Sequence, residues 1–242
     1  MCGRYASPEE EAIAACFPKV RCACGGGWKP SRNVAPTAKV PILVRAGDGA
    51  LELHAARWGL IPKWWRKDKP PALAFNARSE DAAQKPTWRD GLRSMRCLMP
   101  ARGWYEWNPR EPALDAAGRE GPQPYFFFSP AAPVIAFAGI WSLWERPGSA
   151  PVLSCALLSK KAAPGISAIH PRMPAVLKPE HFPRWLDSAT GLDAVQAILA
   201  DAREDLEAYP VSLRVNDARN DGPELLDRIQ PRPAGLFRLE GI

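Results

Sequence analysis

Residues 96–107 read Arg96-Cys97-Leu98-Met99-Pro100-Ala101-Arg102-Gly103-Trp104-Tyr105-Glu106-Trp107. Two runs rich in apolar and aromatic residues, at 96–99 and 103–107, lie on either side of a Pro-Ala-Arg stretch. Short runs of this kind, bounded by Pro and Gly, are typical of β-strands. We therefore predict two consecutive strands here, and the same pattern recurs along most of the chain.

Similar runs predict strands on both sides of this segment, and Ala46-Gly47-Asp48-Gly49 indicates a hairpin between two of them. The predicted strands are 41–45, 51–58, 96–99, 103–107, 125–128, 134–141, 152–158 and 174–177. Helices are predicted at about 8–17, 87–93, 179–186, 192–206 and 223–229. At the first helix, Ser7 and Glu10 would form a capping box.

The order of these elements favours an α+β fold. Strands and helices do not alternate in the way that a parallel βαβ sheet requires. We expect a curved, barrel-like, mostly antiparallel sheet core with peripheral helices. No internal repeat and no linker divides the 242 residues, so we interpret 1–242 as a single domain.

Composition excludes several classes of protein. Hydrophobic residues at 46% and charged residues at 24% are ordinary for a globular chain and exclude disordered and collagen-like proteins. No run of 18 apolar residues could span a membrane, and the first residues lack the apolar segment of a signal peptide. We expect a cytoplasmic protein whose six cysteines form no disulfides.

Positive charge is concentrated in one part of the chain. Residues 1–110 hold 19 Lys+Arg and 10 Asp+Glu, a net charge of +9, whereas 111–242 hold 13 and 16, a net charge of −3. In the basic part, Trp64 and Trp65 stand among Lys and Arg, as in surfaces that stack on unpaired bases and bind phosphates. Either a nucleic-acid surface or a solvated loop from a GC-rich genome would have this composition.

Two neighbouring cysteines raise the question of a metal site. Cys22 and Cys24 form a C-x-C pair beside Gly25–Gly27, but zinc sites usually take about four ligands, and no second pair is present. The three histidines are His54, His170 and His181. We predict no metal centre and no cofactor.

The second residue offers a specific reaction. Methionine aminopeptidase removes Met1 before a small residue such as Cys2, which would then carry a free α-amine. This amine has a pKa of about 7.7–8.0 and the thiol one of about 8.5, so both are partly nucleophilic near neutral pH. A 1,2-aminothiol condenses with an aldehyde to an imine, which the thiolate closes into a thiazolidine ring. Taken alone, an incidental cysteine is the simpler interpretation.

Three further polar residues could assist such chemistry. Asn76, within 74–80, could orient an amine by hydrogen bonds, or it could belong to a turn. Glu106 would have a raised pKa if it were buried among its aromatic neighbours, or it could face solvent. His170, followed by Pro171, could be a proton shuttle or a structural histidine. The residues alone leave each alternative open.

Together, nine segments in order resemble the SRAP family of SOS response-associated peptidases, also called abasic-site processing proteins. The resemblance extends from residue 1 to about residue 230, which implies a domain core at about 2–230. The segments are MCGRY (1–5), APT (35–37), RWGLIP (57–62), NARSE (76–80), RCLMP (96–100), GWYEW (103–107), FAGIW (137–141), IH with RMP (169–174) and VN (215–216).

The resemblance implies binding of single-stranded DNA, or of a single/double-strand junction, that carries an abasic site. It implies a thiazolidine crosslink between Cys2 and the ring-opened sugar, AP-lyase activity as a side reaction, and autocatalytic exposure of Cys2 as the peptidase activity. We expect a monomer. The implied catalytic residues are Cys2, Asn76, Glu106 and His170. The implied DNA contacts are Arg4, Trp64, Trp65, Arg78, Trp107, Lys160 and Arg172.

The sequence departs from the family pattern at Lys160, Ala163 and Pro171. Lys160 would replace a hydroxyl–phosphate hydrogen bond by a charge contact. Pro171 replaces an acidic residue that could pair with His170. Two other functions fit the residues: an N-terminal-nucleophile cysteine peptidase or amidohydrolase, and a non-catalytic single-strand-binding module.

Overall fold

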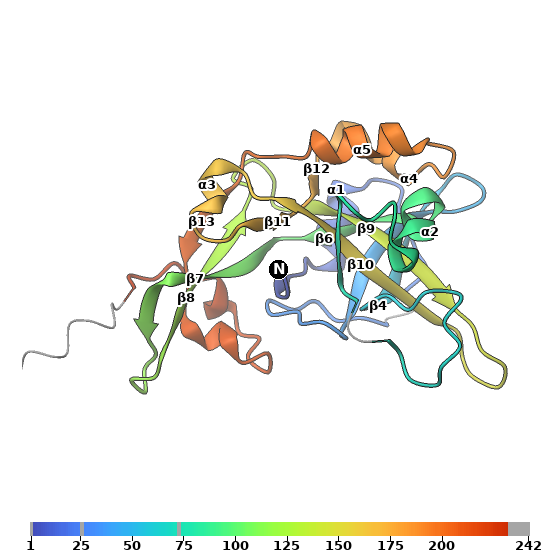
Figure 1. Cartoon of the computed structure of the whole chain (residues 1–242). Coiled ribbons are helices and arrows are strands. Elements are labelled where there is room, and N and C mark those ends of the chain that lie inside the picture. The colour runs from blue at the N-terminus through green and yellow to red at the C-terminus, as the bar shows by residue number, and fades with distance from the viewer. Residues whose placement is uncertain (1, 25–26, 72–73, 232–242) are drawn as a thin grey trace, which may run out of the picture.

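Figure 1 shows a computed structural model of the chain, in which residues 2–24, 27–71 and 74–231 are described. Met1, whose removal we expect, and Gly25 and Gly26 of the Gly-rich loop lie outside these residues. Two β-sheets pack against each other, and helices cover the other face of the larger sheet. The predicted α+β class is confirmed; over the described residues the two sheets stay separate and form no closed barrel.

The larger sheet has nine strands within the described chain. Its main path runs β11-β10-β4-β3-β6-β9-β12, with β2 paired to β4 and β5 to β10. Its neighbours are mostly antiparallel, as predicted; β10 is parallel to β4 and β5, and β2 is parallel to β4. The strands are β2 (Arg21–Cys22), β3 (Lys39–Arg45), β4 (Leu51–Trp58), β5 (Asn76–Arg78), β6 (Arg96–Ala101), β9 (Ile135–Trp144), β10 (Val152–Lys161), β11 (Arg172–Pro174) and β12 (Val176–Leu177).

The smaller sheet has the order β1-β7-β8-β13. The strands are β1 (Tyr5–Ala6), β7 (Gly103–Leu114), β8 (Glu120–Phe128) and β13 (Glu207–Pro210). The two strands predicted within residues 96–107 are confirmed as β6 and the start of β7. They belong to different sheets, so the chain changes sheet at Arg102.

Gly103, the first residue of β7, is required by this change of sheet. A Cβ atom built on Gly103 would lie 2.1 Å from the carbonyl oxygen of Phe127 and 2.5 Å from the ring of Phe126. Because a backbone oxygen in a paired strand cannot move aside, we expect Gly103→Ala to lower the free energy of unfolding by about 3 kcal/mol. The midpoint of urea unfolding measures this loss.

Gly165 provides the matched control for that substitution. It lies in α3 (Pro164–Ser167), and a Cβ atom built there would have nothing within 4 Å. Gly165→Ala is expected to change the free energy of unfolding by less than about 1 kcal/mol. Equal effects of the two substitutions would contradict the steric argument at Gly103.

Four helices cover the face of the larger sheet that points away from the smaller one (Figure 1): α1 (Glu10–Cys16), α2 (Pro86–Ser94), α4 (Phe182–Leu186) and α5 (Leu192–Ala200). Buried side chains from all four, among them Ile13, Trp88, Trp185 and Val195, pack on that face. The chain also forms α3 and the 3-10 turns η1 (Pro179–His181), η2 (Leu213–Asn216) and η3 (Pro223–Leu226). No helix in the described ranges is both long and apolar enough to cross a membrane.

A second core lies between the two sheets. It joins Trp104 and Phe127 of the smaller sheet to Ile42 and Phe137 of the larger one, and it includes Cys2. Trp104 stacks on Phe127, with ring centroids 4.9 Å apart. The chain's second residue is therefore placed in the interior, between the sheets.

Three sequence predictions about boundaries were wrong. Ser7 does not cap the first helix, because its hydroxyl oxygen accepts a hydrogen bond from the Ser31 backbone N–H at 2.9 Å; α1 begins at Glu10 instead. The helix predicted at 192–206 ends at Ala200, and the Arg203 N–H then pairs with the Val176 carbonyl oxygen. The strands predicted at 103–107 and 125–128 are longer in the structure, because most of the stretch between them extends the β7–β8 hairpin.

Candidate active site

Cys2 is held at the centre of a buried polar cluster. The N–H of Tyr5 donates to the Val34 carbonyl oxygen at 3.2 Å, and Tyr5 pairs with Trp104 of β7, which fixes the start of the chain against the smaller sheet. Cys2 is only 1% exposed. The Asn76 amide Nδ2 donates to the Cys2 carbonyl oxygen at 2.8 Å. The segment Asn76–Arg78, for which a turn was the alternative, is strand β5.

Glu106 faces Cys2 from β7. Alternate residues of a strand point to one face, so Glu106 shares the inward face with Trp104. Its exposure is 3%, so the alternative of an outward-facing glutamate is wrong. The Cys2 thiol interacts electrostatically with the Glu106 carboxyl group, and Nε2 of His170 lies 3.7 Å from Glu106 Oε2. Two residues of the predicted set therefore flank one buried carboxyl.

Burial changes the acidity of both groups. It raises the pKa of the Glu106 carboxyl, an effect that interactions with the Cys2 thiol and with His170 partly offset. Burial, followed by the charge of Glu106, raises the pKa of the Cys2 thiol well above its ordinary value. In this buried arrangement the Cys2 thiol favours its protonated form, so its attack on a carbon atom needs a base.

His170 is oriented by the backbone of a tight turn after α3. Its Nδ1 atom lies 2.8 Å from the Arg172 carbonyl oxygen and 3.1 Å from the Arg172 backbone nitrogen. This arrangement leaves Nε2 directed at Glu106. The loss of an acidic residue at Pro171 therefore does not deprive the imidazole of a carboxylate, because Glu106 supplies one from another strand.

Two buried acceptor atoms complete the cluster. Over the described part of the chain, neither Asn76 Oδ1 nor Glu106 Oε1 has a hydrogen-bond partner. A buried acceptor without a partner costs about 1–3 kcal/mol. Both acceptors belong to residues that contact Cys2, so this cluster could bind a group with N–H or O–H donors, such as a freed α-amine or a sugar hydroxyl.

The cations expected to bind phosphates next to this cluster are already paired. Arg172 makes a two-point ion pair with Glu80, at 2.5 and 2.9 Å, and donates to the Ser159 carbonyl oxygen at 2.6 Å. Lys160, which departs from the family pattern, lies 3.2 Å from a carboxylate oxygen of Glu204. A phosphate that bound Arg172 or Lys160 would replace these carboxylates.

Arg78 and Arg4 differ sharply in their surroundings. Arg78 is exposed at the end of β5, opposite Ser159. Arg4 is half-buried: it donates from Nη1 to Asn33 Oδ1 at 2.8 Å and to the Val215 carbonyl oxygen at 2.6 Å. Its guanidinium carbon lies 6.0 Å from the ring centroid of Trp107. Arg4 therefore tethers η2 to the smaller sheet.

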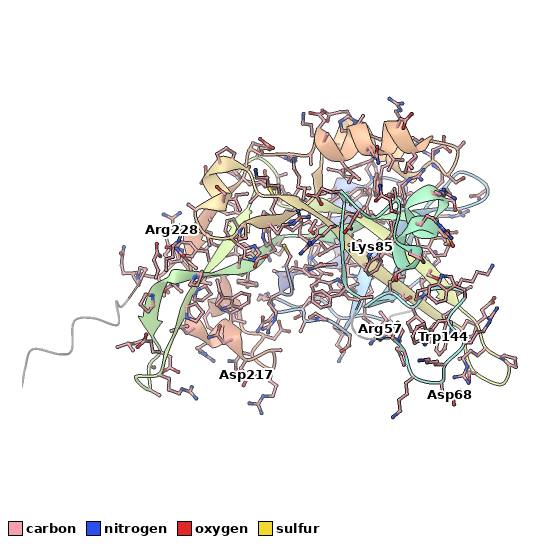
Figure 2. All side chains as sticks on the ribbon, viewed as in Figure 1. Arg57, Asp68, Lys85, Trp144, Asp217 and Arg228 are labelled. Atoms are coloured by element: carbon pink, nitrogen blue, oxygen red, sulfur yellow. The ribbon has the colours of Figure 1, made fainter. Side chains whose placement is uncertain are left out.

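The aromatic candidates lie in two separate places. Trp107 is half-buried and donates to Asn216 Oδ1 at 2.6 Å. Trp64 is 44% exposed and lies 6.1 Å from Trp65, whose carbonyl oxygen accepts a hydrogen bond from Trp144. In Figure 2 Trp144 lies toward one end of the molecule, and Asp217, next to Asn216, lies toward the other. The two aromatic groups are therefore not parts of one stacking platform.

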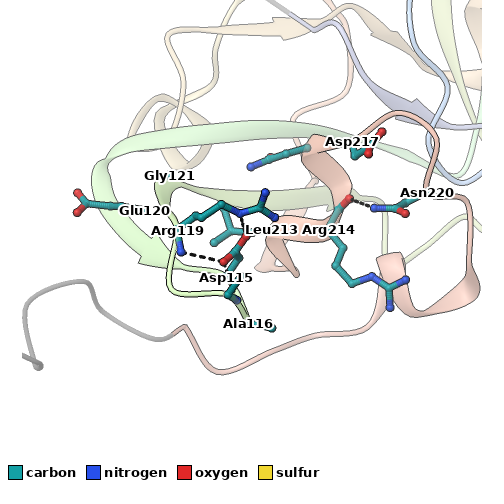
Figure 3. A pocket seen from close by; sticks show the side chains of 11 residues that line it. Asp115, Ala116, Arg119, Glu120, Gly121, Leu213, Arg214, Asp217 and Asn220 are labelled. Atoms are coloured by element: carbon teal, nitrogen blue, oxygen red, sulfur yellow. Dashed lines mark hydrogen bonds and ion pairs between the residues drawn. The ribbon is translucent and has the colours of Figure 1, made fainter.

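A surface pocket lies apart from this cluster. About 490 Å³ in volume, it lies between the β7–β8 hairpin and the segment 213–220 (Figure 3). Its two arginines are paired with carboxylates, Arg119 with Asp115 at 2.7 Å and Arg214 with Glu224 at 3.1 Å. Neither Cys2 nor Glu106 lines it, so the polar cluster around Cys2 remains the candidate reactive site.

Comparisons with known proteins agree with this geometry. The sequence model described as "SOS response associated peptidase (SRAP)" matches residues 1–218. The chain belongs to the SRAP family. The SRAP chain is 34% identical over 231 residues to the abasic site processing protein YoqW of Bacillus subtilis, covering 94% of this chain and 99% of that protein. It is 31% identical over 236 residues to the abasic site processing protein HMCES of Gallus gallus, and the match covers 85% of this chain and 68% of that protein.

Solved structures share the SRAP fold. A crystal structure of a protein from Bacteroides thetaiotaomicron matches with a TM-score of 0.80 and 21% identity, covering 95% of this chain and 100% of that one. A protein from Bordetella bronchiseptica matches with a TM-score of 0.73 and 22% identity, covering 88% and 100%. At these identities the likeness concerns the fold alone.

One structural residue of this SRAP chain was missed by the sequence reasoning. Asn33, which is 2% exposed, binds Arg4 and donates from Nδ2 to the carbonyl oxygens of Asp217 and Asn220 at 3.0 and 2.8 Å. A lone asparagine in the Gly/Pro-rich stretch 21–37 gives no signal of such a role. The two carbonyl oxygens that it binds belong to residues more than 180 positions away in the sequence.

Proposed function

We propose that this SRAP protein processes abasic sites in single-stranded DNA, or at single/double-strand junctions, by forming a covalent thiazolidine crosslink. One observation carries the proposal: the Cys2 thiol, the Asn76 amide and the Glu106 carboxyl group meet in one buried cluster around the second residue of the chain. The relatives named abasic site processing proteins supply the substrate class.

The proposed reaction conserves all atoms. After removal of Met1, the Cys2 amine attacks the aldehyde carbon C1′ of the open sugar, and the aldehyde oxygen leaves as water to give an imine. The Cys2 sulfur then adds to the same carbon, and the thiol proton ends on the ring nitrogen. The thiazolidine no longer has the imine that permits β-elimination of the 3′ phosphate, so strand cleavage becomes a side reaction.

The surrounding residues supply proton transfer and orientation. Glu106, with its raised pKa, would donate a proton to the sugar ring oxygen as the ring opens and accept the thiol proton later. His170 would exchange that proton through Nε2, which lies 3.7 Å from Glu106. The unpartnered Asn76 Oδ1 would accept a hydrogen bond from the freed amine and hold it near C1′.

DNA would bind through exposed and exchangeable groups. Arg78 is exposed, and Arg172 would exchange its contact with Glu80 for a phosphate. Trp64, with 44% exposure, is the aromatic residue best placed to stack on a base. Arg4 and Trp107 would also hold the 3-10 turn η2 in place, because both donate hydrogen bonds to residues 215–216.

The cysteine-peptidase alternative is weaker on physical grounds. A thiol that attacks an amide must ionise readily, usually beside a histidine or another cation. Here the Cys2 thiol contacts a carboxyl group, and its pKa is raised. An aldehyde reacts first with the amine, so the thiol does not need to ionise as readily as it must to attack an amide.

A crosslinking assay tests the proposed function. The purified protein is mixed with a single-stranded oligonucleotide that carries one abasic site, heated in denaturant and separated by electrophoresis. We expect a heat-resistant shifted band that an intact oligonucleotide does not give, with intact mass showing loss of Met1 and of one water on adduct formation. Hydrolysis of peptide substrates without any shifted band would favour the peptidase alternative instead.

Replacement of Arg78 is expected to affect DNA affinity rather than chemistry. Arg78→Ala should weaken binding across all sequences and reduce the slope of log affinity against log salt by about 1, because one phosphate contact is lost. Arg45→Ala is the matched control, since Arg45 is also exposed but lies beside the helices, near Phe182 and Leu186. Fluorescence anisotropy over a salt series measures both; equal slopes for the two variants would remove Arg78 from the interface.

A further inference from the structure

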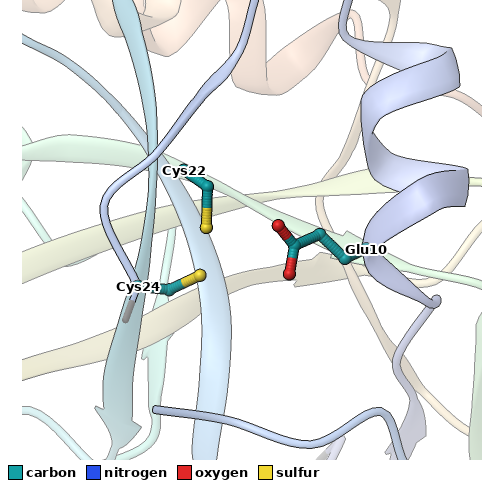
Figure 4. Close-up of side chains that lie close together, drawn as sticks. All are labelled: Glu10, Cys22 and Cys24. Carbon is teal, nitrogen blue, oxygen red and sulfur yellow. The ribbon is translucent and has the colours of Figure 1, made fainter. Parts of the chain in front are cut away.

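Three side chains far from Cys2 meet at the edge of the larger sheet. Glu10, Cys22 and Cys24 each offer one ligand atom, and these atoms all lie within 4.8 Å of one another. Figure 4 shows their side chains directed toward a common point. The Cys22 thiol interacts with both Cys24 and Glu10, and this raises its pKa to about 11. The sequence offered only the C-x-C pair; folding brings the carboxylate to it.

Separate elements hold the three residues of this Glu10–Cys22–Cys24 cluster. Glu10 is the first residue of α1, and Cys22 is fixed in β2 by its pairing with Leu53 of β4. Cys24 is 8% exposed and packs in the core beneath the helices. The Ala23 N–H donates to the Leu53 carbonyl oxygen at 2.9 Å, so the backbone between the two cysteines is anchored as well.

The spacing and chemistry of the cluster fit a tetrahedral metal ion. Zinc binds thiolate sulfur at about 2.3 Å and carboxylate oxygen at about 2.0–2.2 Å, which places tetrahedral ligand atoms about 3.5–3.8 Å apart. Ligand atoms within 4.8 Å would reach this spacing through small side-chain rotations. Two sulfur ligands favour zinc over magnesium or calcium, and a carboxylate suits zinc better than copper(I).

We propose that Glu10, Cys22 and Cys24 form a zinc-binding site with one coordination position left for water. The two thiols would lose their protons on binding, and the ion would join α1 to the β2 edge of the sheet. The site is independent of the abasic-site chemistry, because none of its ligands belongs to the Cys2 cluster.

Cobalt(II) is the probe that tests this site. Titration of the reduced, metal-free protein with Co²⁺ should give a thiolate-to-cobalt band and visible bands typical of tetrahedral cobalt, which saturate at one ion per chain and disappear when Zn²⁺ is added. Glu10→Ala and Cys22→Ser should each weaken Zn²⁺ binding by about 100-fold or more. Zinc at about 100 times its dissociation constant should raise Tm by about 5–10 °C in the unaltered protein and not in Cys22→Ser.

Cys16→Ser is the matched control, because Cys16 is an exposed free cysteine outside the cluster. It should keep the cobalt bands, the zinc affinity and the zinc-dependent rise in Tm. Absence of tetrahedral cobalt bands would overturn the proposal, as would equal losses in Cys16→Ser and Cys22→Ser. A Cys22–Cys24 disulfide that persists under reducing conditions would also overturn it, and peptide mass spectrometry would detect that bond.

Discussion

Cys2→Ser is expected to abolish the stable crosslink while preserving the first chemical step. The serine variant keeps the α-amine after Met1 removal, so it still forms an imine with the abasic aldehyde. A hydroxyl closes the ring poorly, and the imine either hydrolyses or permits β-elimination. We therefore expect no heat-resistant band, a band that returns when borohydride reduces the imine, and increased strand cleavage.

The assay for this variant separates amine from thiol chemistry. Denaturing electrophoresis with and without borohydride gives the two adducts, and a labelled 5′ end reports cleavage. Cys16→Ser, which alters an exposed free cysteine, should crosslink like the unaltered protein. A heat-resistant band from Cys2→Ser without borohydride would show that another residue makes the bond.

Glu106→Gln is expected to slow crosslinking by about 10²–10⁴-fold, the usual contribution of a positioned acid or base. Glutamine keeps the shape of the side chain, but it cannot protonate the ring oxygen or accept the thiol proton. DNA affinity should change little, because Glu106 is 3% exposed. Single-turnover crosslinking rates and anisotropy measure the two effects separately.

A control on the same strand isolates the effect of burial at Glu106. Glu111 also lies in β7, but it is exposed and binds the Tyr125 hydroxyl at 2.5 Å. Glu111→Gln should leave the crosslinking rate within about twofold. Parallel losses of rate and of DNA affinity in Glu106→Gln would contradict a chemical role for Glu106.

The same substitution should stabilise the fold at neutral pH. Burial raises the pKa of Glu106, so its carboxyl group favours the folded state most when it is protonated. That contribution is present below about pH 4.3, the ordinary value for Glu, and is lost as the pH rises through the raised pKa of the folded state. We expect Glu106→Gln to unfold at higher urea at pH 7, with a gain of about 1 kcal/mol, and to show no gain at pH 4.

Local patterns in the sequence predicted most of the strands. The hairpin at 41–58 and the strands at 96–107 were confirmed because apolar runs bounded by Gly and Pro are local signals. Strands β1 and β13 were missed, because β1 has two residues and β13 has four. Such short segments become strands only by pairing with β7 and β8, which the chain brings from elsewhere.

The candidate site was likewise predictable from the sequence only in part. The order of the family motifs gave Cys2, Asn76, Glu106 and His170 as candidate site residues without any structure. Whether Glu106 faced inward was undecided, because Trp104 and Tyr105 are both aromatic and each face of β7 could have been the buried one. Packing buries both of these side chains, and only the contacts to Cys2 and His170 distinguish the two faces.

The sequence by itself determined the fold class and the family, since these depend on strand periodicity and on motif order, and its cysteine in the second position made Cys2 the candidate reactive residue. Only the tertiary structure decided how acidic that thiol is, which cations are paired, and that Glu10 meets Cys22 and Cys24. These properties depend on distance and burial between residues remote in the chain. Electrostatic effects in a protein interior vary with position over a few ångströms, so no local pattern of residues encodes them.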